Sequence, residues 1–212
     1  MLPARGLDRE FFAGLEKMDE GIACAVAAAR CRHCEGPLHK GNYQRKPRGA
    51  LISEAGEAFT LRYSLCCGRR GCRKRSLPPS VRFLGRRVYL EVVVVLAVAF
   101  VQAVASLGRA VTASGVPRRT LQRWGSWWRD DFPRLPVWAA LRARFVPPPP
   151  DETDLPRSLY QRIGADLPRA DRSRGDPAQS EVMVLLARCL APATTGSVLD
   201  GSRFLGAVAA AG

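Results

Sequence analysis

Two cysteine-rich stretches, CRHC at residues 31–34 and CCGRRGC at residues 66–72, decide how the middle of this 212-residue chain folds. The residues between them lose any helical period and are punctuated by glycine and proline, which favours a β-hairpin or a short sheet. Short thiolate turns at strand ends supply the four sulfurs that a structural zinc ion takes in tetrahedral geometry. A β-region this small has little core of its own, so a bound metal would provide much of its stability. The sequence therefore predicts a small zinc ribbon over residues 30–80.

The expected zinc ligands are Cys31, Cys34, Cys67 and Cys72. Cys66 competes with Cys67 for the third position, because both spacings to Cys72 exceed the usual two-residue gap. Four thiolates leave no open coordination position, so we expect the zinc to be structural and not catalytic. A CxxC pair can also be a redox couple, but no βαβ pattern of the kind that carries such couples is visible here.

Positive charge is concentrated in the centre of the chain. The net charge is +14, and residues 30–90 hold fifteen bases against three acids. Residues 69–87 alone carry eight bases and no acid. These positive charges repel one another unless a polyanion neutralises them. Arginine makes up 29 of the 33 bases, as a GC-rich gene would favour, but that bias does not explain why the two ends of the chain are nearly neutral. We therefore expect a nucleic-acid partner and not merely a solvated basic face.

Residues 109–124, RAVTASGVPRRTLQRW, are typical of a helix-turn-helix unit. The first helix is expected to end at Gly115, where a left-handed backbone suits glycine, and Pro117 is expected to open the second. The second helix has an apolar face opposite an Arg/Gln face, as a recognition helix in a major groove requires. An ordinary amphipathic hairpin is the alternative. The apolar face consists of Pro117, Leu121, Trp124 and Trp128, and the opposite face of Arg118, Arg119, Gln122, Arg123 and Ser126.

Two regions are therefore expected to contact DNA. The basic block after the second cysteine turn would bind phosphates, and the helix after Pro117 would read base edges, since Arg can pair with guanine and Gln with adenine. The predicted DNA-binding residues are Arg73, Lys74, Arg75, Arg86, Arg87, Arg118, Arg119, Thr120, Gln122 and Arg123.

The whole chain is expected to be α+β: a small β zinc ribbon followed by a mostly α helix-turn-helix domain, with a helical N-terminus and a partly disordered C-terminal tail. Asp8 is expected to cap the first helix, and Cys24 and Cys189 are expected to be buried in helices. Four consecutive prolines at 147–150 predict a stiff linker, and the polar residues after them predict disorder. The expected units are an N-terminal helix at 1–29, the ribbon at 30–80, the helix-turn-helix domain at 81–146, a Pro-rich linker at 147–176, and a C-terminal helix and tail at 177–212.

We expect no membrane partner. The longest apolar run, residues 92–101, is ten residues long, whereas a bilayer span needs about 20. It lies where a three-helix unit needs its supporting helix, so a buried core helix is expected. Charged residues throughout the first 20 positions exclude a signal peptide there, which favours a reducing, cytoplasmic compartment in which clustered cysteines bind metal.

The order of these modules resembles the DNA-binding end of bacterial insertion-sequence transposases and their accessory proteins. The resemblance covers roughly residues 30–132 and rests on CxxC at 31–34, RYxxCC at 62–67, CRKR at 72–75 and SGVPRRTLQRW at 114–124. It implies a zinc-dependent protein of the bacterial nucleoid that binds double-stranded DNA as an accessory or regulator of a mobile element. A transposase or recombinase is the protein partner that it implies.

We expect no enzymatic activity. A transposase with three catalytic carboxylates needs acids placed by an α/β nuclease fold, and no βαβ series surrounds the few acids between residues 30 and 146. The two histidines, His33 and His39, are expected to be exposed, and they do not form the pair that a nicking site needs. Two alternatives stay open: an RNA-binding zinc-ribbon protein, and a protein–protein adaptor for a recombinase.

Overall fold

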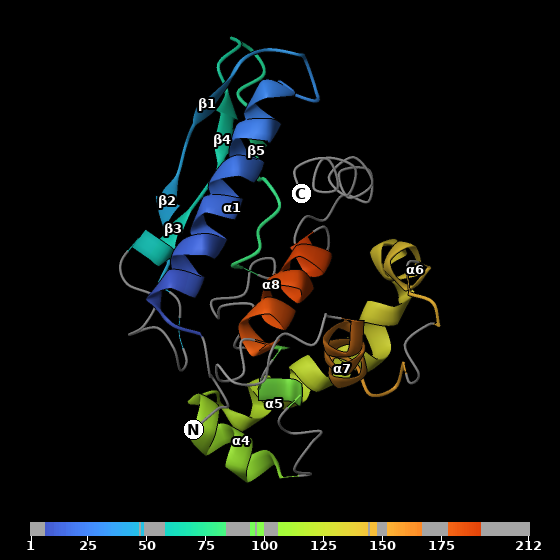
Figure 1. Ribbon diagram of the computed structural model, residues 1–212. Helices are drawn as coiled ribbons and strands as arrows, with labels where there is room; N and C mark the ends of the chain where they lie inside the picture. The colour runs from blue at the N-terminus through green and yellow to red at the C-terminus, as the bar shows by residue number, and fades with distance from the viewer. Residues whose placement is uncertain are drawn as a thin grey trace.

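A long helix and a small sheet form one part of the protein, and shorter helices form the rest (Figure 1). In this computed structural model the described residues are 7–46, 48, 58–83, 94–95, 97–99, 106–143, 145–147, 152–166 and 178–191. The mixture of helix and antiparallel sheet agrees with the predicted α+β class.

Helix α1, Arg9–Ala28, begins as the sequence predicts. The Asp8 carboxylate accepts a hydrogen bond from the backbone N–H of Phe11 at 2.9 Å, which satisfies one of the free donors of the first turn. The apolar stripe of α1 is buried along most of its length, from Phe11 to Ile22. Cys24 is exposed, so the prediction of a buried Cys24 is wrong. It lies about 200° round the helix from Ile22 and therefore on the outer face.

The three-stranded antiparallel sheet has the order β1-β4-β5. Strand β1 is Leu38–Lys40, β4 is Leu65–Cys67 and β5 is Arg75–Ser76. In the register between β1 and β4, Leu38 pairs with Cys67 and His39 pairs with Cys66. The sheet therefore ends where the second cysteine turn begins.

A second, two-stranded sheet pairs β2, Tyr43–Gln44, with β3, Leu61–Arg62. The alternating residues from 59 to 65 suggest one continuous strand, but Ala58–Thr60 is a 3-10 turn, η1, and residues 63 and 64 separate β3 from β4. Ser64 makes the break: its carbonyl accepts from the Gly41 N–H at 2.7 Å, and its N–H donates to the Asn42 side chain.

A buried ion pair fastens α1 to the segment that follows the sheet. The Asp19 carboxylate accepts hydrogen bonds from Arg82 Nε at 2.8 Å, Ser80 Oγ at 2.6 Å and the Val81 N–H at 2.7 Å. The guanidinium group of Arg82 also donates to the Leu61 carbonyl and lies over the ring of Phe59. Every oxygen and nitrogen in this pair has a partner, which is the condition under which a buried ion pair is tolerated.

Two helices and a tight turn follow, near the other end of the molecule. Helix α4, Leu107–Ser114, ends at Gly115, whose φ of 64° is in the left-handed region. Val116 is buried, and α5, Arg118–Ser126, starts directly after Pro117. The helical path continues as η2, Trp127–Asp131, a π-helical turn, and η3, Phe132–Arg134, a 3-10 turn, and α6, Pro136–Arg142, comes next.

Helices α7, Arg157–Asp166, and α8, Ala178–Leu190, pack against each other. The prediction of a disordered linker is therefore wrong for residues 152–166. Leu155, Leu159 and Ile163 recur at four-residue spacing and are buried, so the polar composition of this region conceals one apolar helix face. The C-terminal helix predicted within residues 177–212 is confirmed as α8.

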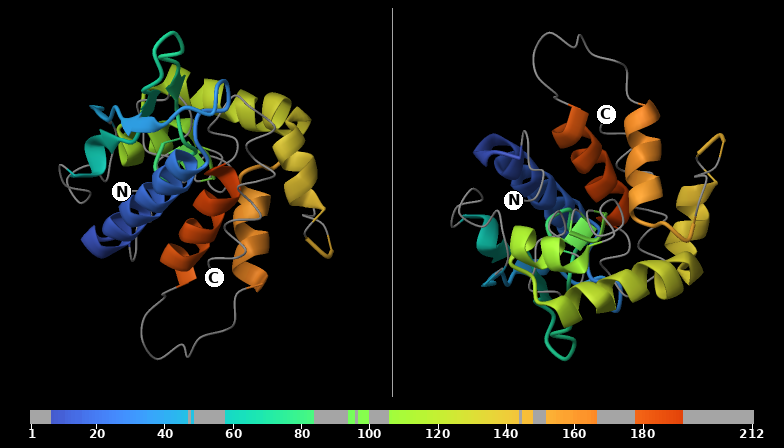
Figure 2. Two further views of the ribbon diagram at one scale, coloured as in Figure 1. Left: turned by 90° about the horizontal axis from the view of Figure 1, so that it is seen from above. Right: turned by 90° about the horizontal axis from the view of Figure 1, so that it is seen from below.

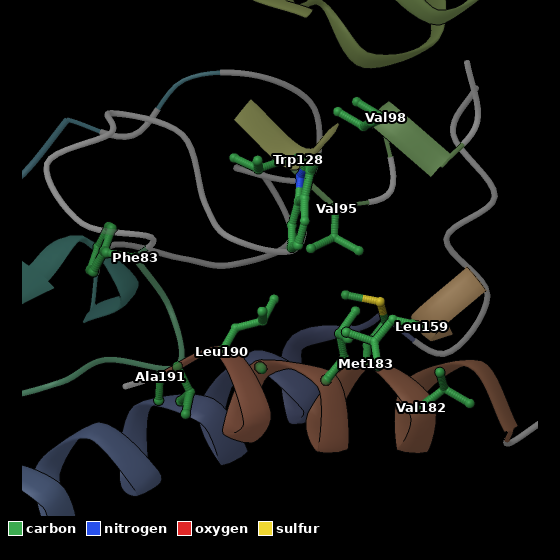
Figure 3. Packing of buried hydrophobic residues seen from close by; sticks show 14 of the residues in the cluster. Phe83, Val95, Val98, Trp128, Leu159, Val182, Met183, Leu190 and Ala191 are labelled. Carbon is green, nitrogen blue, oxygen red and sulfur yellow. The ribbon is translucent and has the colours of Figure 1, made fainter. Parts of the chain in front are cut away.

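One apolar core joins these helices. Figure 3 shows Met183 and Leu190 of α8 and Leu159 of α7 on one side, with Trp128, Val95 and Val98 on the other. The described residues of the apolar run from 92 to 101 are helical, and Val95 and Val98 are buried, as a core helix requires. Among the residues that the structure describes, no helix is both long enough and apolar enough to cross a membrane.

Candidate metal centre and nucleic-acid interface

The first cysteine turn follows the C-terminal end of α1. Arg30 has a φ of 63°, which turns the chain out of the helix. The Cys31 carbonyl then accepts hydrogen bonds from the N–H groups of Cys34, at 3.2 Å, and Glu35, at 2.7 Å. The Cys31 N–H donates to the Gly36 carbonyl at 3.0 Å and closes the turn. With the turn closed in this way, the sulfurs of Cys31 and Cys34 lie on the same side of it.

The second cysteine turn leaves the end of β4. The Cys67 N–H donates to the Lys74 carbonyl at 3.0 Å, and the Cys72 N–H donates to the Arg69 carbonyl at 3.1 Å. The wider spacing of this turn is absorbed at Gly71, whose φ is 87°, a conformation that favours glycine. The two extra residues therefore change the shape of the loop and still allow Cys67 and Cys72 to face the first turn.

The sulfurs of the four cysteines predicted as ligands lie within 4.8 Å of one another. The Cys31 and Cys72 sulfurs are 3.8 Å apart, and the Cys34 and Cys67 sulfurs are 3.4 Å apart. A tetrahedron with metal–sulfur bonds of ~2.3 Å has sulfurs about 3.8 Å apart, so the cluster has the size of a tetrahedral thiolate site. Cys66 is not in the group, because successive residues of β4 face opposite sides of the sheet. This arrangement can bind a metal ion.

Electrostatics also favours a cation at this position. Hydrogen bonding from the Gly36 backbone N–H is the main cause that lowers the pKa of Cys34 to about 7. The Arg69 N–H acts in the same direction on Cys67, but burial and the neighbouring thiols outweigh it and raise the pKa of Cys67 to about 12. Four thiolates this close repel one another, and a divalent cation between them removes that repulsion.

Gly36 permits the close approach of the two turns. A Cβ atom at this position would lie 2.9 Å from the Cβ of Arg69, 3.1 Å from the Cys67 sulfur and 3.3 Å from the Cys34 sulfur. Gly36 is not among the residues that the sequence pattern singled out. The available signal was its place two residues after the CxxC pair, where the chain crosses back over the site.

Basic residues surround the two cysteine turns, residues 31–36 and 67–74, which we call the metal end, and one of these bases joins the two turns. Arg69 Nη1 donates to the Cys34 carbonyl at 2.9 Å. Arg70, Arg73 and Lys74 are exposed, and Arg75 is exposed beside the ring of Tyr43. Both histidines are exposed, as expected, and neither belongs to the sulfur cluster.

Two bases of the central region are not on the surface. Arg82, within the eight-base block, is buried against Asp19, and Arg62 is buried with its guanidinium group bonded to the carbonyls of Tyr63 and Pro78. Burial is the main cause that lowers the pKa of Arg62. These two arginines hold the fold and are unavailable for phosphate contacts. The predicted contacts Arg86 and Arg87 lie outside the described residues.

Helix α5 has one buried and one exposed face. Leu121 and Trp124 of α5 are at most 2% exposed. Trp128 in the adjoining turn η2 is buried as well, and it points into the core toward α8 (Figure 3). Pro117 was expected on this buried face but is exposed, and the buried Val116 fills that place in the turn. Four of the five predicted contact residues on α5 are exposed, and Thr120 is half-buried. The exposed four are Arg118, Arg119, Gln122 and Arg123.

The metal end and α5 stand at opposite ends of the molecule, and α1 extends between them (Figure 1). In both views of Figure 2 the sheet with its turns and α5 lie toward one side, whereas α1, α7 and α8 lie toward the other. The two regions predicted to contact DNA are therefore separate surfaces.

The four-cysteine cluster is the one group of three or more metal-ligating side chains within the described parts of the chain. The four sulfurs lie close enough together to bind a metal ion. Comparisons of the chain with protein family models, with curated proteins and with solved structures find no match.

Proposed function

We propose that this protein is a zinc-stabilised, double-stranded DNA-binding protein in which α4 and α5 act as a helix-turn-helix. The observation that carries the proposal is the two-sided character of α5. Its apolar residues are buried in the core, and Arg119, Gln122 and Arg123 are exposed on the opposite side. Among the described residues no ion pair occupies these guanidinium groups, so they are available to phosphates and base edges.

The proposed metal is zinc, on the chemistry of the donor set. Thiolates are soft ligands, and four of them in a closed tetrahedron favour zinc over magnesium or calcium, which take oxygen ligands. The metal would hold the turn after α1 against the turn after β4, and it would thereby hold the bases of both turns in fixed positions. It would take no part in a reaction.

The proposed biological role is that of an accessory or regulatory protein of a mobile element. The support is the order of the modules along the chain, a cysteine ribbon followed by a helix-turn-helix, which resembles the DNA-binding end of insertion-sequence transposases. The expected macromolecular partners are duplex DNA and a transposase or recombinase.

Fluorescence anisotropy with labelled duplex DNA tests the DNA-binding part of the proposal. Binding should weaken steeply as salt rises. Arg119→Gln/Arg123→Gln should lower the affinity, because it removes two cations that would contact base edges or phosphates, and each lost phosphate contact should also lower the salt slope by about 0.9. The matched control is Arg9→Gln/Arg134→Gln, which removes two exposed arginines outside α5. Equal affinity for the α5 variant and the wild type would refute the proposal. Structured RNA that competes better than duplex DNA would assign the basic surface to RNA.

Metal analysis of the purified protein tests the zinc site. The wild type should hold one zinc per chain, Cys34→Ser should lose it, and Cys66→Ser should keep it, because the Cys66 sulfur is outside the cluster. Full zinc occupancy in Cys34→Ser would contradict the proposed ligand set.

A further inference from the structure

We propose that the two cysteine turns form a second contact surface for the same DNA duplex, about one helical turn away from the groove that α5 enters. This inference rests on the proposed function, because α5 is taken as the first contact. It adds a prediction that the proposed function alone does not make: full affinity requires a duplex longer than the site of α5.

The first observation is the charge of the turns. Arg32 on the first turn and Arg70, Arg73 and Lys74 on the second are exposed. Glu35 is the one acid between residues 30 and 53, and it is exposed on the first turn. The balance of charge at this end is strongly positive and suits a polyanion.

The second observation is that the backbone holds these bases in fixed positions. Arg73, with a φ of 47°, lies between Cys72 of the sulfur cluster and Lys74, whose carbonyl accepts the Cys67 N–H. Arg69 ties the second turn to the first through the Cys34 carbonyl. The backbone of a loop that is fixed at both ends loses little conformational freedom when the loop binds phosphate, so a defined contact is favoured.

The third observation is the placement of the two surfaces. The turns lie at the C-terminal end of α1, and α4 and α5 lie at the opposite end of the molecule, toward which the N-terminal end of α1 is directed (Figure 1). A helix of 20 residues is about 30 Å long, and one turn of B-DNA is about 34 Å. The separation of the two surfaces is therefore on the order of one turn of duplex or more.

The two surfaces also lie toward the same side of the molecule. The buried residues of α5, Leu121 and Trp124, belong to the same apolar core as Trp128 of the adjoining turn η2, which points toward α8 (Figure 3). The exposed Arg/Gln face of α5 is opposite that core, and in both views of Figure 2 α5 lies toward the same side of the molecule as the sheet with the cysteine turns. A single duplex along this side can occupy the α5 site and reach the turns with its phosphates.

The test compares duplex lengths with a matched pair of variants. Arg73→Gln/Lys74→Gln removes two bases from the metal end, and Arg9→Gln/Lys17→Gln removes one arginine and one lysine from exposed positions of α1. Affinities are measured on duplexes of about 12 and about 24 bp with the same central site, that is, little more than one and two helical turns. Zinc content and circular dichroism verify that each variant keeps its metal and its helices.

On the long duplex, the affinity of the wild type should depend more steeply on salt than that of Arg73→Gln/Lys74→Gln. Between 50 and 200 mM salt its affinity should fall by a factor about 10-fold larger, as expected for two additional phosphate contacts. On the short duplex the two proteins should bind alike, and the α1 control should match the wild type on both. Equal weakening of the Arg73/Lys74 variant on both lengths, or no weakening on either, would overturn the inference. The failure of Arg119→Gln/Arg123→Gln to weaken binding on either duplex would instead remove the proposed function.

Discussion

Replacing Gly36 with alanine is the sharpest test of how the two cysteine turns meet. The added Cβ would lie 2.9 Å from the Cβ of Arg69 and 3.1 Å from the Cys67 sulfur, and the first of these is closer than real Cβ contacts allow. Neither neighbour is the free end of a flexible side chain, since one is bonded to backbone and the other belongs to the metal cluster. The turns must therefore move apart by several tenths of an ångström.

Overpacking of this kind costs about 1–3 kcal/mol. The strain is relieved by moving a ligand away from the metal, so we expect this cost to appear as weaker zinc binding. At about 1.4 kcal/mol per tenfold change in affinity, 1–3 kcal/mol corresponds to a roughly 5- to 150-fold fall in zinc affinity. Competition with a chromophoric chelator measures this change.

Gly21→Ala is the matched control, because a Cβ at this exposed helical position meets nothing within 4 Å. Alanine is favoured over glycine in a helix interior, so this variant should be more stable by about 0.5–1 kcal/mol and should bind zinc as the wild type does. If Gly36→Ala binds zinc as tightly as the wild type, the two turns are not packed across one ion and the metal centre as described is refuted.

Two further predictions concern the fold around the site. Asp19→Asn should destabilise the protein by up to about 3–5 kcal/mol in urea unfolding, because it removes the fully buried carboxylate partner of Arg82 and leaves only the partly exposed Glu16, at 3.7 Å. Glu20→Gln on the exposed face should change little. Burial is the main cause that raises the pKa of Tyr63 above its usual value of 10.0. Above pH 10 the folded state therefore keeps a proton that the unfolded state releases. The contribution of Tyr63 to stability is present below pH 10 and is lost as the pH rises above that value. Tyr63→Phe should therefore lose less stability than the wild type between about pH 10 and 11, while Tyr43→Phe should follow the wild type; identical alkaline profiles for Tyr63→Phe and the wild type would contradict this reasoning.

The elements with a strong local signal were predictable. Asp8 and the apolar stripe after it specify α1, and Gly115 followed by Pro117 specifies the turn between α4 and α5, because capping and left-handed glycine are properties of a few adjacent residues. The association of the two cysteine turns was also predictable from their spacing. The choice of Cys67 over Cys66 was not, because it depends on which side of β4 each residue faces. The break between β3 and β4 was not, because it depends on Asn42 and Ser64, which are 22 residues apart.

Helix α7 was missed because composition outweighed periodicity. The four prolines at 147–150 and the charged residues after them are typical of a linker, and the apolar signal consists of three residues that become meaningful only when α8 covers them. Half-buried helices of this kind gain most of their stability from tertiary packing and little from local propensity. A sequence without its partner helix therefore gives a weak signal for α7.

Arg62 and Arg82 show why charge counting could not define the nucleic-acid surface. In the sequence they are indistinguishable from Arg70 and Arg73, since all four lie in the basic centre of the chain. The groups that bury Arg62 and Arg82 are distant in the sequence. Asp19, 63 residues before Arg82, supplies its buried carboxylate, and the Leu61 carbonyl also accepts from Arg82. The Pro78 carbonyl accepts from Arg62. Removing these two bases from the surface divides the remaining positive charge between the cysteine turns and α5. Because the positive charge is divided between two separate surfaces, we expect the affinity for DNA to depend on the length of the duplex and not on the total charge alone.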